Sequence, residues 1–160
     1  MTSSRSQFNE KKITSSGGRG TARFPRAARL LARSEFVRVY DHGKKEFSRS
    51  FTFFYLLHTV SEEQQGTTSG RAAHRFYAGD VRFGLTVGRV LGNSVRRSKI
   101  KRRTREMLRT ERGMLSSRLM ARNIAADIVV HPKKSVYDAE YSTLAAEVVK
   151  GLGAIAEAGL

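Results

Sequence analysis

Two segments of this chain place apolar residues at the spacing of an amphipathic helix. In residues 34–43, Phe36, Val39 and Tyr40 fall on one face at i, i+3 and i+4, and Gly43 is a typical helix end. Residues 137–155 follow the same rule, and their inner face consists of Tyr141, Leu144, Ala145, Val148 and Leu152. Both segments are therefore predicted to be helices that pack one face against a core.

A third helix is predicted from residue 94 to about residue 113. The turn formers Gly92 and Asn93 precede it and supply an N-cap. Its core-facing stripe follows the i, i+4, i+7, i+8 rule and consists of Ile100, Thr104, Met107, Leu108 and Glu111. Gly113 marks its expected end or its last, frayed turn.

Strand-like segments separate these helices. Residues 47–59 are rich in aromatic residues and threonine, and residues 81–88 and 127–130 are further apolar segments. The first segment alternates: one side consists of Phe51, Phe53 and Tyr55, and the other of Thr52, Phe54 and Leu56. His131 and Pro132 are expected to stop the last strand. The order of helix, strands, helix, strand and helix predicts an α+β domain with a small sheet.

Two polar segments flank or interrupt this domain. Residues 1–22 contain few apolar side chains and are predicted to be a disordered basic and polar tail, because they cannot bury enough surface to offset chain entropy. Residues 60–79 are rich in turn formers and are predicted to be a flexible insertion between two strands. The remaining chain, residues 23–160, is expected to form a single domain.

The charge of the chain points to an anionic partner. Lys and Arg number 30 against 14 Asp and Glu, which gives a net charge of +16 and a pI near 11.1. Within residues 89–112, ten of the 24 residues are Lys or Arg and only two are acidic. The helical ridge opposite the core stripe consists of Arg102, Arg105, Arg109 and Arg112. Uncompensated repulsion of this kind is typical of a surface that binds a polyphosphate backbone.

Several classes of protein are not expected from this sequence. No stretch approaches the roughly 20 apolar residues that a membrane span needs, and the N-terminus has no hydrophobic signal core, so a cytoplasmic protein without membrane contact is predicted. The chain has no cysteine, which excludes disulfides and cysteine zinc sites. Phosphate-binding glycine loops and hydrolase motifs are absent, and the four histidines are scattered. We therefore expect a binding protein with no catalytic residues and no metal site of its own, although distant residues could still converge in space.

The aromatic residues near the first helix admit two interpretations. Each of them can be explained as part of the core. If one face of the sheet stays open, however, the aromatic side chains of residues 36–55 could stack on unpaired bases, which tolerates any base sequence.

Three blocks of the chain, residues 29–56, 82–106 and 127–133, resemble the protein subunit of bacterial ribonuclease P. The middle block is the specific one, because that family carries a Gly-Asn turn, an Arg-Asn-Arg core and a Lys-Arg-x-x-Arg continuation. The matching positions are Gly92, Asn93, Arg97, Ser98, Lys99, Lys101, Arg102 and Arg105. Ser98 replaces the central Asn and Lys99 the second Arg, so one bidentate fork becomes a point charge.

The resemblance implies a two-layer α–β sandwich with three helices and a small mixed sheet of about four strands, in the order α-β-β-β-α-β-α, with a left-handed βαβ crossover. It implies that the basic helix binds the catalytic RNA, through Arg89, Asn93, Arg96, Arg97, Lys99, Lys101, Arg102, Arg105 and Arg109. It implies a cleft for the single-stranded 5′ leader of precursor tRNA, formed by Phe36, Tyr40, Arg49, Thr52 and Phe54.

The resemblance also implies that cleavage is performed by the RNA with bound Mg²⁺, and that one protein binds one RNA. A general RNA-binding or ribosome-associated protein is the alternative, since it would share the basic helix. A protein nuclease would need a cluster of carboxylates or histidines, which the sequence does not display.

Overall fold

The computed structural model of the chain describes residues 24–60 and 76–158. The helices of this part are α1 (Arg33–His42), α2 (Ser94–Met120) and α3 (Tyr141–Ala158). The strands are β1 (Lys44–Phe47), β2 (Phe51–Thr59), β3 (Val81–Leu85) and β4 (Ile124–Pro132). The predicted order α-β-β-β-α-β-α is confirmed. The predicted tail and residues 61–75 of the predicted insertion lie outside the described residues.

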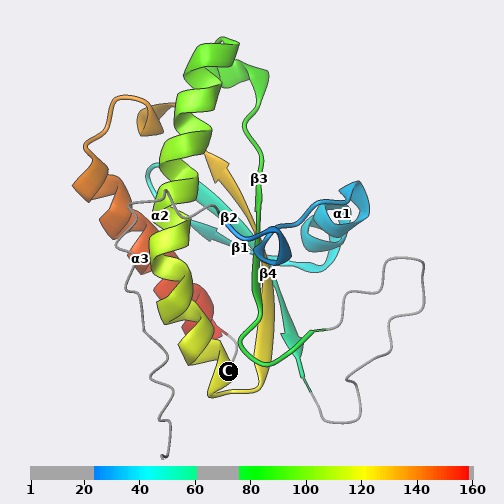
Figure 1. The fold of residues 1–160 in the computed structure, drawn as a ribbon. Helices are drawn as coiled ribbons and strands as arrows, with labels where there is room; N and C mark the ends of the chain where they lie inside the picture. Colours follow the sequence, from blue (N-terminus) through cyan, green and yellow to red (C-terminus); the bar gives the residue numbers. More distant parts are fainter. Residues whose placement is uncertain (1–23, 61–75, 159–160) are drawn as a thin grey trace, which may run out of the picture.

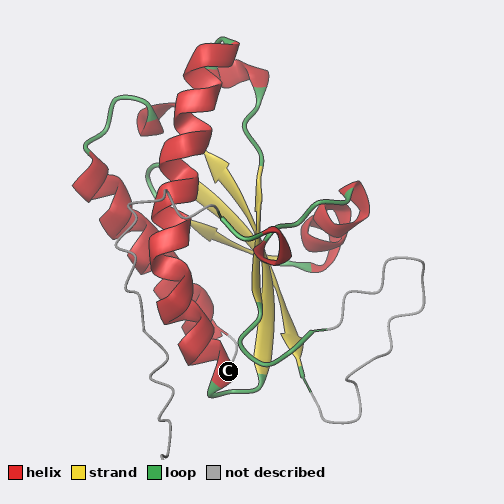
Figure 2. Ribbon diagram, in the orientation of Figure 1, coloured by secondary structure: helices red, strands yellow, loops and turns green. Residues whose placement is uncertain are grey.

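The four strands form one mixed sheet in the order β1-β2-β4-β3. β2 pairs antiparallel with β1 and β4, whereas β3 pairs parallel with β4. A parallel pair needs a crossover, and α2 supplies it. The hand of this crossover stays a prediction. Figures 1 and 2 show α2 and α3 together on one face of the sheet and α1 on the opposite face.

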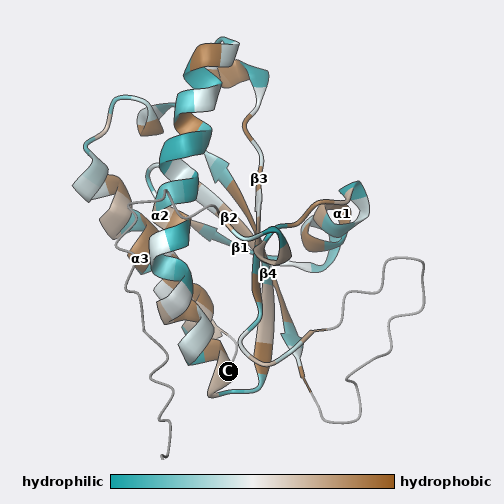
Figure 3. Ribbon diagram, in the orientation of Figure 1, coloured by the Kyte–Doolittle hydropathy of each residue, from teal (hydrophilic) through white to brown (hydrophobic). Residues whose placement is uncertain are grey.

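The two faces of the sheet bury different sets of side chains. Phe51, Phe53 and Ile128 belong to the large core under α2 and α3, which confirms the predicted alternation of β2. A smaller cluster under α1 centres on Leu30, Val39 and Val129, and the residues packed against it are Phe36, Tyr40, Phe54 and Leu56. Figure 3 shows α2 mostly in hydrophilic colours, in keeping with the few buried positions on this helix.

The prediction of one strand over residues 47–59 is wrong, because the chain reverses at residues 48–50. The side chain of Glu147 on α3 holds this turn by accepting hydrogen bonds from Ser48 Oγ at 2.8 Å and from Ser50 N at 2.7 Å. β1 therefore pairs with β2 as a hairpin. β1 lies at the edge of the sheet. Its sequence, Lys-Lys-Glu-Phe, has no alternation of apolar and polar residues from which a strand could be predicted.

Several predicted ends of elements are also wrong. α2 continues past Gly113, because Leu115 and Leu119 extend its buried stripe. Glu111, assigned to that stripe, is only half-buried. β4 contains His131 and Pro132 and does not stop before them, since Pro132 still pairs with Phe51.

The start of the last helix was predicted four residues too early, because contacts with α2 hold the preceding chain in another conformation. Arg103 on α2 donates hydrogen bonds to the carbonyls of Val136 and Tyr137 at 3.0 Å and of Ala139 at 2.7 Å. Tyr141, predicted to face the core, is 44% exposed. No helix within the described residues has both the length and the apolar character needed to cross a bilayer.

Candidate RNA interface

The basic helix α2 is anchored by its N-terminal turn and its buried stripe. Gly92 has a φ of 119°, a value that favours glycine, and Asn93 Oδ1 accepts the N–H of Arg96 at 2.9 Å. The predicted stripe residues Ile100, Thr104, Met107 and Leu108 are fully buried. Because these two features fix both the start and the rotation of α2, its basic side chains face outward in a defined direction.

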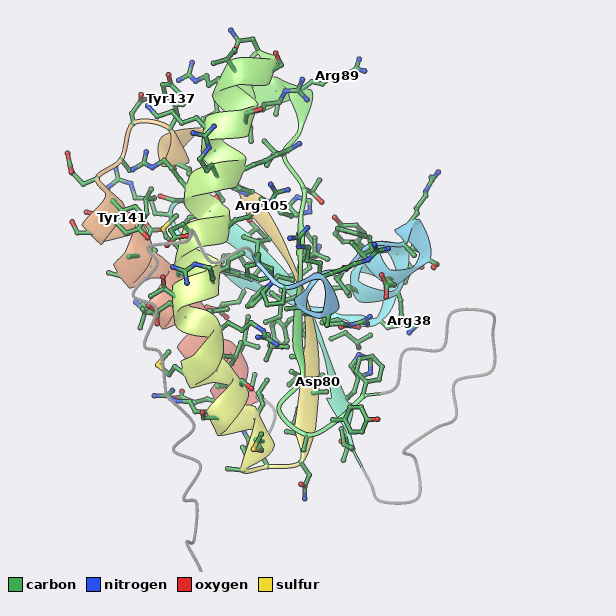
Figure 4. The ribbon with its side chains drawn as sticks, viewed as in Figure 1. Arg38, Asp80, Arg89, Arg105, Tyr137 and Tyr141 are labelled. Carbon is green, nitrogen blue, oxygen red and sulfur yellow. The ribbon has the colours of Figure 1, made fainter. Side chains whose placement is uncertain are left out.

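The predicted arginine ridge is only partly available to a ligand. Arg102 and Arg105 are exposed, and no acidic residue in the described part of the chain pairs with either. Arg109 pairs with Glu106 at 2.6 Å, and Arg112 Nε donates to the carbonyl of Val81 at 3.3 Å. Figure 4 labels Arg105 near the middle of α2. The free part of the ridge, Arg102 and Arg105, therefore lies near the middle of α2.

In the first turns of α2, two predicted RNA-binding residues make cation–π contacts with the same aromatic ring. The guanidinium of Arg96 lies 3.9 Å from the centroid of Tyr137, and Lys99 Nζ lies 4.8 Å from it. Arg96 also lies 3.7 Å from the exposed carboxylate of Asp138. Tyr137 was not expected from the sequence, because nothing in it indicates that a residue more than 40 positions after the start of α2 returns to this helix.

The other predicted residues of this surface differ in exposure. Arg89 is exposed in the short 3₁₀ segment Arg89–Leu91, beside the N-terminal start of α2 in Figure 4. Lys101 is half-buried. Arg97 is half-buried too, and its Nε is a buried atom with no hydrogen-bond partner among the described residues. The surface is therefore a mixture of free cations and cations held by other groups.

The predicted cleft residues gather on the α1 face of the sheet around His131. Tyr40 Oη lies 2.7 Å from His131 Nε2 and 3.1 Å from Thr86 Oγ1. The ring of Phe54 packs against Tyr40 and His131, with centroids 5.0 and 4.8 Å away. Burial lowers the pKa of His131, so its imidazole is neutral near pH 7. Neither His131 nor Thr86 was expected from the sequence.

The remaining cleft residues lie at different distances from this aromatic cluster. Thr52 pairs with His131 across the sheet, and both are half-buried. Phe36 packs over Gly84, where an added Cβ would meet Cε1 of its ring at 2.5 Å. Arg49 is exposed in the β1–β2 turn, outside the cluster. The structure therefore packs Phe36, Tyr40 and Phe54 against one buried cluster, places Thr52 beside His131, and leaves Arg49 outside.

A buried ionic network ties α1 to the sheet on the same face as these residues. Arg82, 3% exposed, donates to both carboxylate oxygens of Asp127 at 2.7 Å and to Glu35 Oε1 at 2.6 Å. His58 Nε2 lies 3.2 Å from Asp127. Glu35 Oε2 also accepts the N–H groups of Leu31 and Ala32. One guanidinium thus connects α1, β3 and β4.

The acidic residues of this network remain ionised to low pH. Burial by itself would raise the pKa of Asp127, but hydrogen bonds from His58 and Arg82 outweigh it and lower that pKa. Burial likewise opposes ionisation of Glu35. Its backbone hydrogen bonds and the charge of Arg82 leave its pKa lowered. The described residues contain no group of three histidine, aspartate or glutamate side chains that could hold a metal ion.

Comparison with known proteins relates this arrangement to one family. The family model described as ribonuclease P matches residues 24–156. The chain is 34% identical over 108 residues to the ribonuclease P protein component of Maridesulfovibrio salexigens, with 68% of each chain covered. It is 29% identical over 133 residues to that of Citrifermentans bemidjiense, with 83% of this chain and 92% of the relative covered.

Solved structures show the same fold. The ribonuclease P protein of Staphylococcus aureus matches with a TM-score of 0.56 and 22% identity, over 81% of this chain and 95% of that chain. The ribonuclease P protein of Thermotoga maritima matches with a TM-score of 0.55 and 23% identity, over 78% and 94%. At this level of identity the likeness concerns the fold.

Proposed function

This chain belongs to the ribonuclease P protein family, and on that basis we propose that it binds the catalytic RNA and the 5′ leader of precursor tRNA to promote removal of the leader. It would act in the cytoplasm as one protein on one RNA. The observation that carries the proposal is the docked helix α2, whose free cations Arg102 and Arg105 face away from a fully buried stripe. A phosphate backbone supplies the charge that this surface lacks.

The residues of the predicted leader cleft beside α1 suit a single strand better than a duplex. Tyr40 and Phe54 form its aromatic floor, and Lys45 Nζ lies 5.2 Å from the ring of Phe54. Aromatic rings with a nearby cation are the usual elements of a surface that stacks unpaired bases and neutralises their backbone. The leader would therefore lie across β2 and β4, on the sheet face opposite α2.

The chemistry of cleavage would come from the RNA. The described residues offer no cluster of carboxylates or histidines for a metal, so coordination of Mg²⁺ would fall mainly to RNA phosphates and to groups at the interface with the substrate. Mg²⁺ there would activate water for attack on the phosphodiester and stabilise the leaving oxygen. The role of this chain would be to hold the RNA and the leader in place.

Cleavage of precursor tRNA at low Mg²⁺ tests this function directly. We expect a bacterial ribonuclease P RNA to cleave poorly at low Mg²⁺ alone and efficiently when this protein is added. The protein alone should not cleave at any Mg²⁺ concentration. A general RNA-binding protein would give no stimulation. Cleavage by nuclease-free protein that disappears on changing one of its own aspartates or histidines would contradict the proposal.

The free part of the ridge should contribute to binding of the catalytic RNA through its charge. The double variant Arg102→Ala and Arg105→Ala should reduce the slope of log K against log salt by roughly 1.4–1.8 for two lost phosphate contacts. The pair Arg118→Ala and Lys150→Ala removes the same charge at exposed positions and serves as the control. An unchanged slope in the ridge variant, with full stimulation of cleavage, would remove the ridge from the interface.

A further inference from the structure

Residues 24–31, which precede α1, run along the edge strand β3. We call residues 24–31 the N-terminal strap. The strap bonds to β3 through the N–H of Leu30, which donates to the carbonyl of Phe83 at 3.0 Å, and the ring of Phe24 packs edge-on against that of Phe83 at 5.9 Å. Because β3 is an edge strand of the sheet, the strap covers the edge of β3 that no other described strand pairs with. Figure 1 shows the strap passing between α2 and α1.

A hollow of about 730 Å³ separates the strap from α2. Its lining includes the arginines Arg26, Arg29, Arg102, Arg105 and Arg109. Among the described residues of the lining, the one acidic side chain is Glu106, which Arg109 already binds. Arg26, Arg102 and Arg105 have no acidic partner within the described residues. Arginines gathered around a hollow without countercharge repel one another, so the site favours an anionic occupant.

The hollow also has an apolar wall. Phe24, Pro25 and Leu31 line it, and the side chain of Leu31 is 57% exposed. A smaller recess of about 190 Å³ shares Phe24, Arg29, Leu31 and Arg105 with it, and continues inward to Phe36 and Leu108. Guanidinium groups next to an aromatic and aliphatic wall match the two halves of a nucleotide, its phosphate and its base. The volume lies within the roughly 300–1,000 Å³ of small-ligand sites.

Arg29 is held in place for such a role. Its Nε donates to the carbonyl of Phe24 at 3.0 Å, and its second terminal nitrogen donates to the same oxygen. These bonds fix the plane of the guanidinium and leave its other N–H groups available. Arg26 lies in the short 3₁₀ segment Arg26–Ala28, which Ala28 anchors in the core. The strap therefore presents its two arginines from a fixed backbone.

We propose that this hollow receives one unpaired nucleotide of the catalytic RNA, whose phosphate is bound by Arg26, Arg29 and Arg105 and whose base lies on the wall of Phe24 and Leu31. The proposal rests on the function proposed above. The catalytic RNA is the source because Arg102 and Arg105 belong both to the hollow and to the free part of the ridge. An RNA bound along the ridge is thus continuous with the hollow. Tyr40 and Phe54 of the predicted leader cleft do not line the hollow and pack under α1, on the sheet face opposite α2.

Site-directed cross-linking tests the position of the nucleotide. The chain has no cysteine, so Leu31→Cys carries a single photoactivatable group at the rim of the hollow. In the assembled holoenzyme with precursor tRNA, we expect cross-links to the catalytic RNA at one unpaired position. Pro25→Cys, at an exposed residue of the same hollow, should give the same position. Val149→Cys on α3 should give none. Cross-links that go to the precursor tRNA, or that scatter along the catalytic RNA, would overturn the proposal.

Removal of the base at the cross-linked position tests its contribution. An abasic substitution there should weaken binding of the protein to the catalytic RNA by roughly 5- to 150-fold, as expected for one lost stack. Arg26→Met should reduce the salt slope by roughly 0.7–0.9, as expected for one lost phosphate contact. If the abasic RNA binds as tightly as the unmodified RNA, the proposal that the hollow receives a nucleotide is wrong. Continued stimulation of cleavage at low Mg²⁺ would show that the proposed function still holds. If the unaltered protein does not stimulate cleavage by the unaltered RNA at low Mg²⁺, the proposed function itself is wrong.

Discussion

Replacing Arg82 by methionine should lower the free energy of unfolding by about 3–5 kcal/mol, the usual cost of removing one partner from a buried ion pair. Arg82 and Asp127 are 3% and 1% exposed, so water cannot replace the lost hydrogen bonds. The variant would leave Asp127 with His58 alone and would free Glu35 from the sheet. We expect urea denaturation of the isolated protein to show this loss.

The matched control for this substitution is Arg109→Met. Arg109 pairs with Glu106 at the same distance of 2.6 Å that separates Arg82 from Glu35, but it does so at the surface. Exposed ion pairs contribute little to stability, so this variant should unfold almost like the parent protein. Equal losses for the two arginines would show that burial does not determine the strength of the network.

The dependence of stability on pH separates charge from packing in the Arg82 variant. The pKa values of Asp127 and Glu35 are lowered in the folded protein from 3.8 and 4.5. Groups with lowered pKa values stabilise the fold above their unfolded values, and this contribution is lost as the pH falls through the folded values. Below about pH 5, the parent protein should therefore lose stability, and its advantage over Arg82→Met should narrow. A constant difference down to pH 2 would assign the effect to packing.

Replacing Phe36 by alanine should lower the free energy of unfolding by about 3 kcal/mol, toward the low end for buried aromatic residues because Phe36 is only half-buried. Its ring covers Gly84 and packs with the cluster of Leu30, Val39 and Val129. Thermal melting of the free protein measures this loss. Val37→Ala, at an exposed position of the same helix, should melt almost like the parent protein.

The same variant should also discriminate precursor from mature tRNA less well. Phe36 lies one helical turn before Tyr40, so its loss removes part of the wall of the proposed leader cleft. At a temperature where the variant is folded, binding of a precursor with a leader of several nucleotides should weaken by roughly 1–3 kcal/mol, as for one lost stack. Affinity for mature tRNA should barely change. Equal losses for both tRNAs would mean that Phe36 only packs.

Regular periodicity made part of the fold predictable. The stripe of Ile100, Met107 and Leu108 and the alternation of β2 follow from spacing alone, because neighbouring turns and alternate strand residues share a face. The edge strand β1 has no such pattern, and its partner and the carboxylate of Glu147 define it instead. The end of α2 was misplaced because Gly113 is a weak signal that buried residues on either side override.

The candidate site was predictable in its residue types more than in its geometry. Charge and spacing indicated the ridge and the aromatic residues of the cleft. They could not distinguish Arg103, which holds three backbone carbonyls, from Arg105, which is free. Nor could they reveal Tyr137 beneath Arg96. Both differences depend on the segment that follows β4 in the sequence and returns to α2.

The sequence by itself determined that this protein has an amphipathic basic helix, a strand with two distinct faces, a strong positive charge and a motif of one family. These properties are local or additive, so a linear pattern contains them completely. Only the tertiary structure decided that Tyr40 meets His131, 91 residues away, that Arg82 joins Asp127 to Glu35, and that the strap and α2 enclose a hollow. Hydropathy specifies which face of an element is buried. The partner that it meets there depends on how the whole chain folds back on itself.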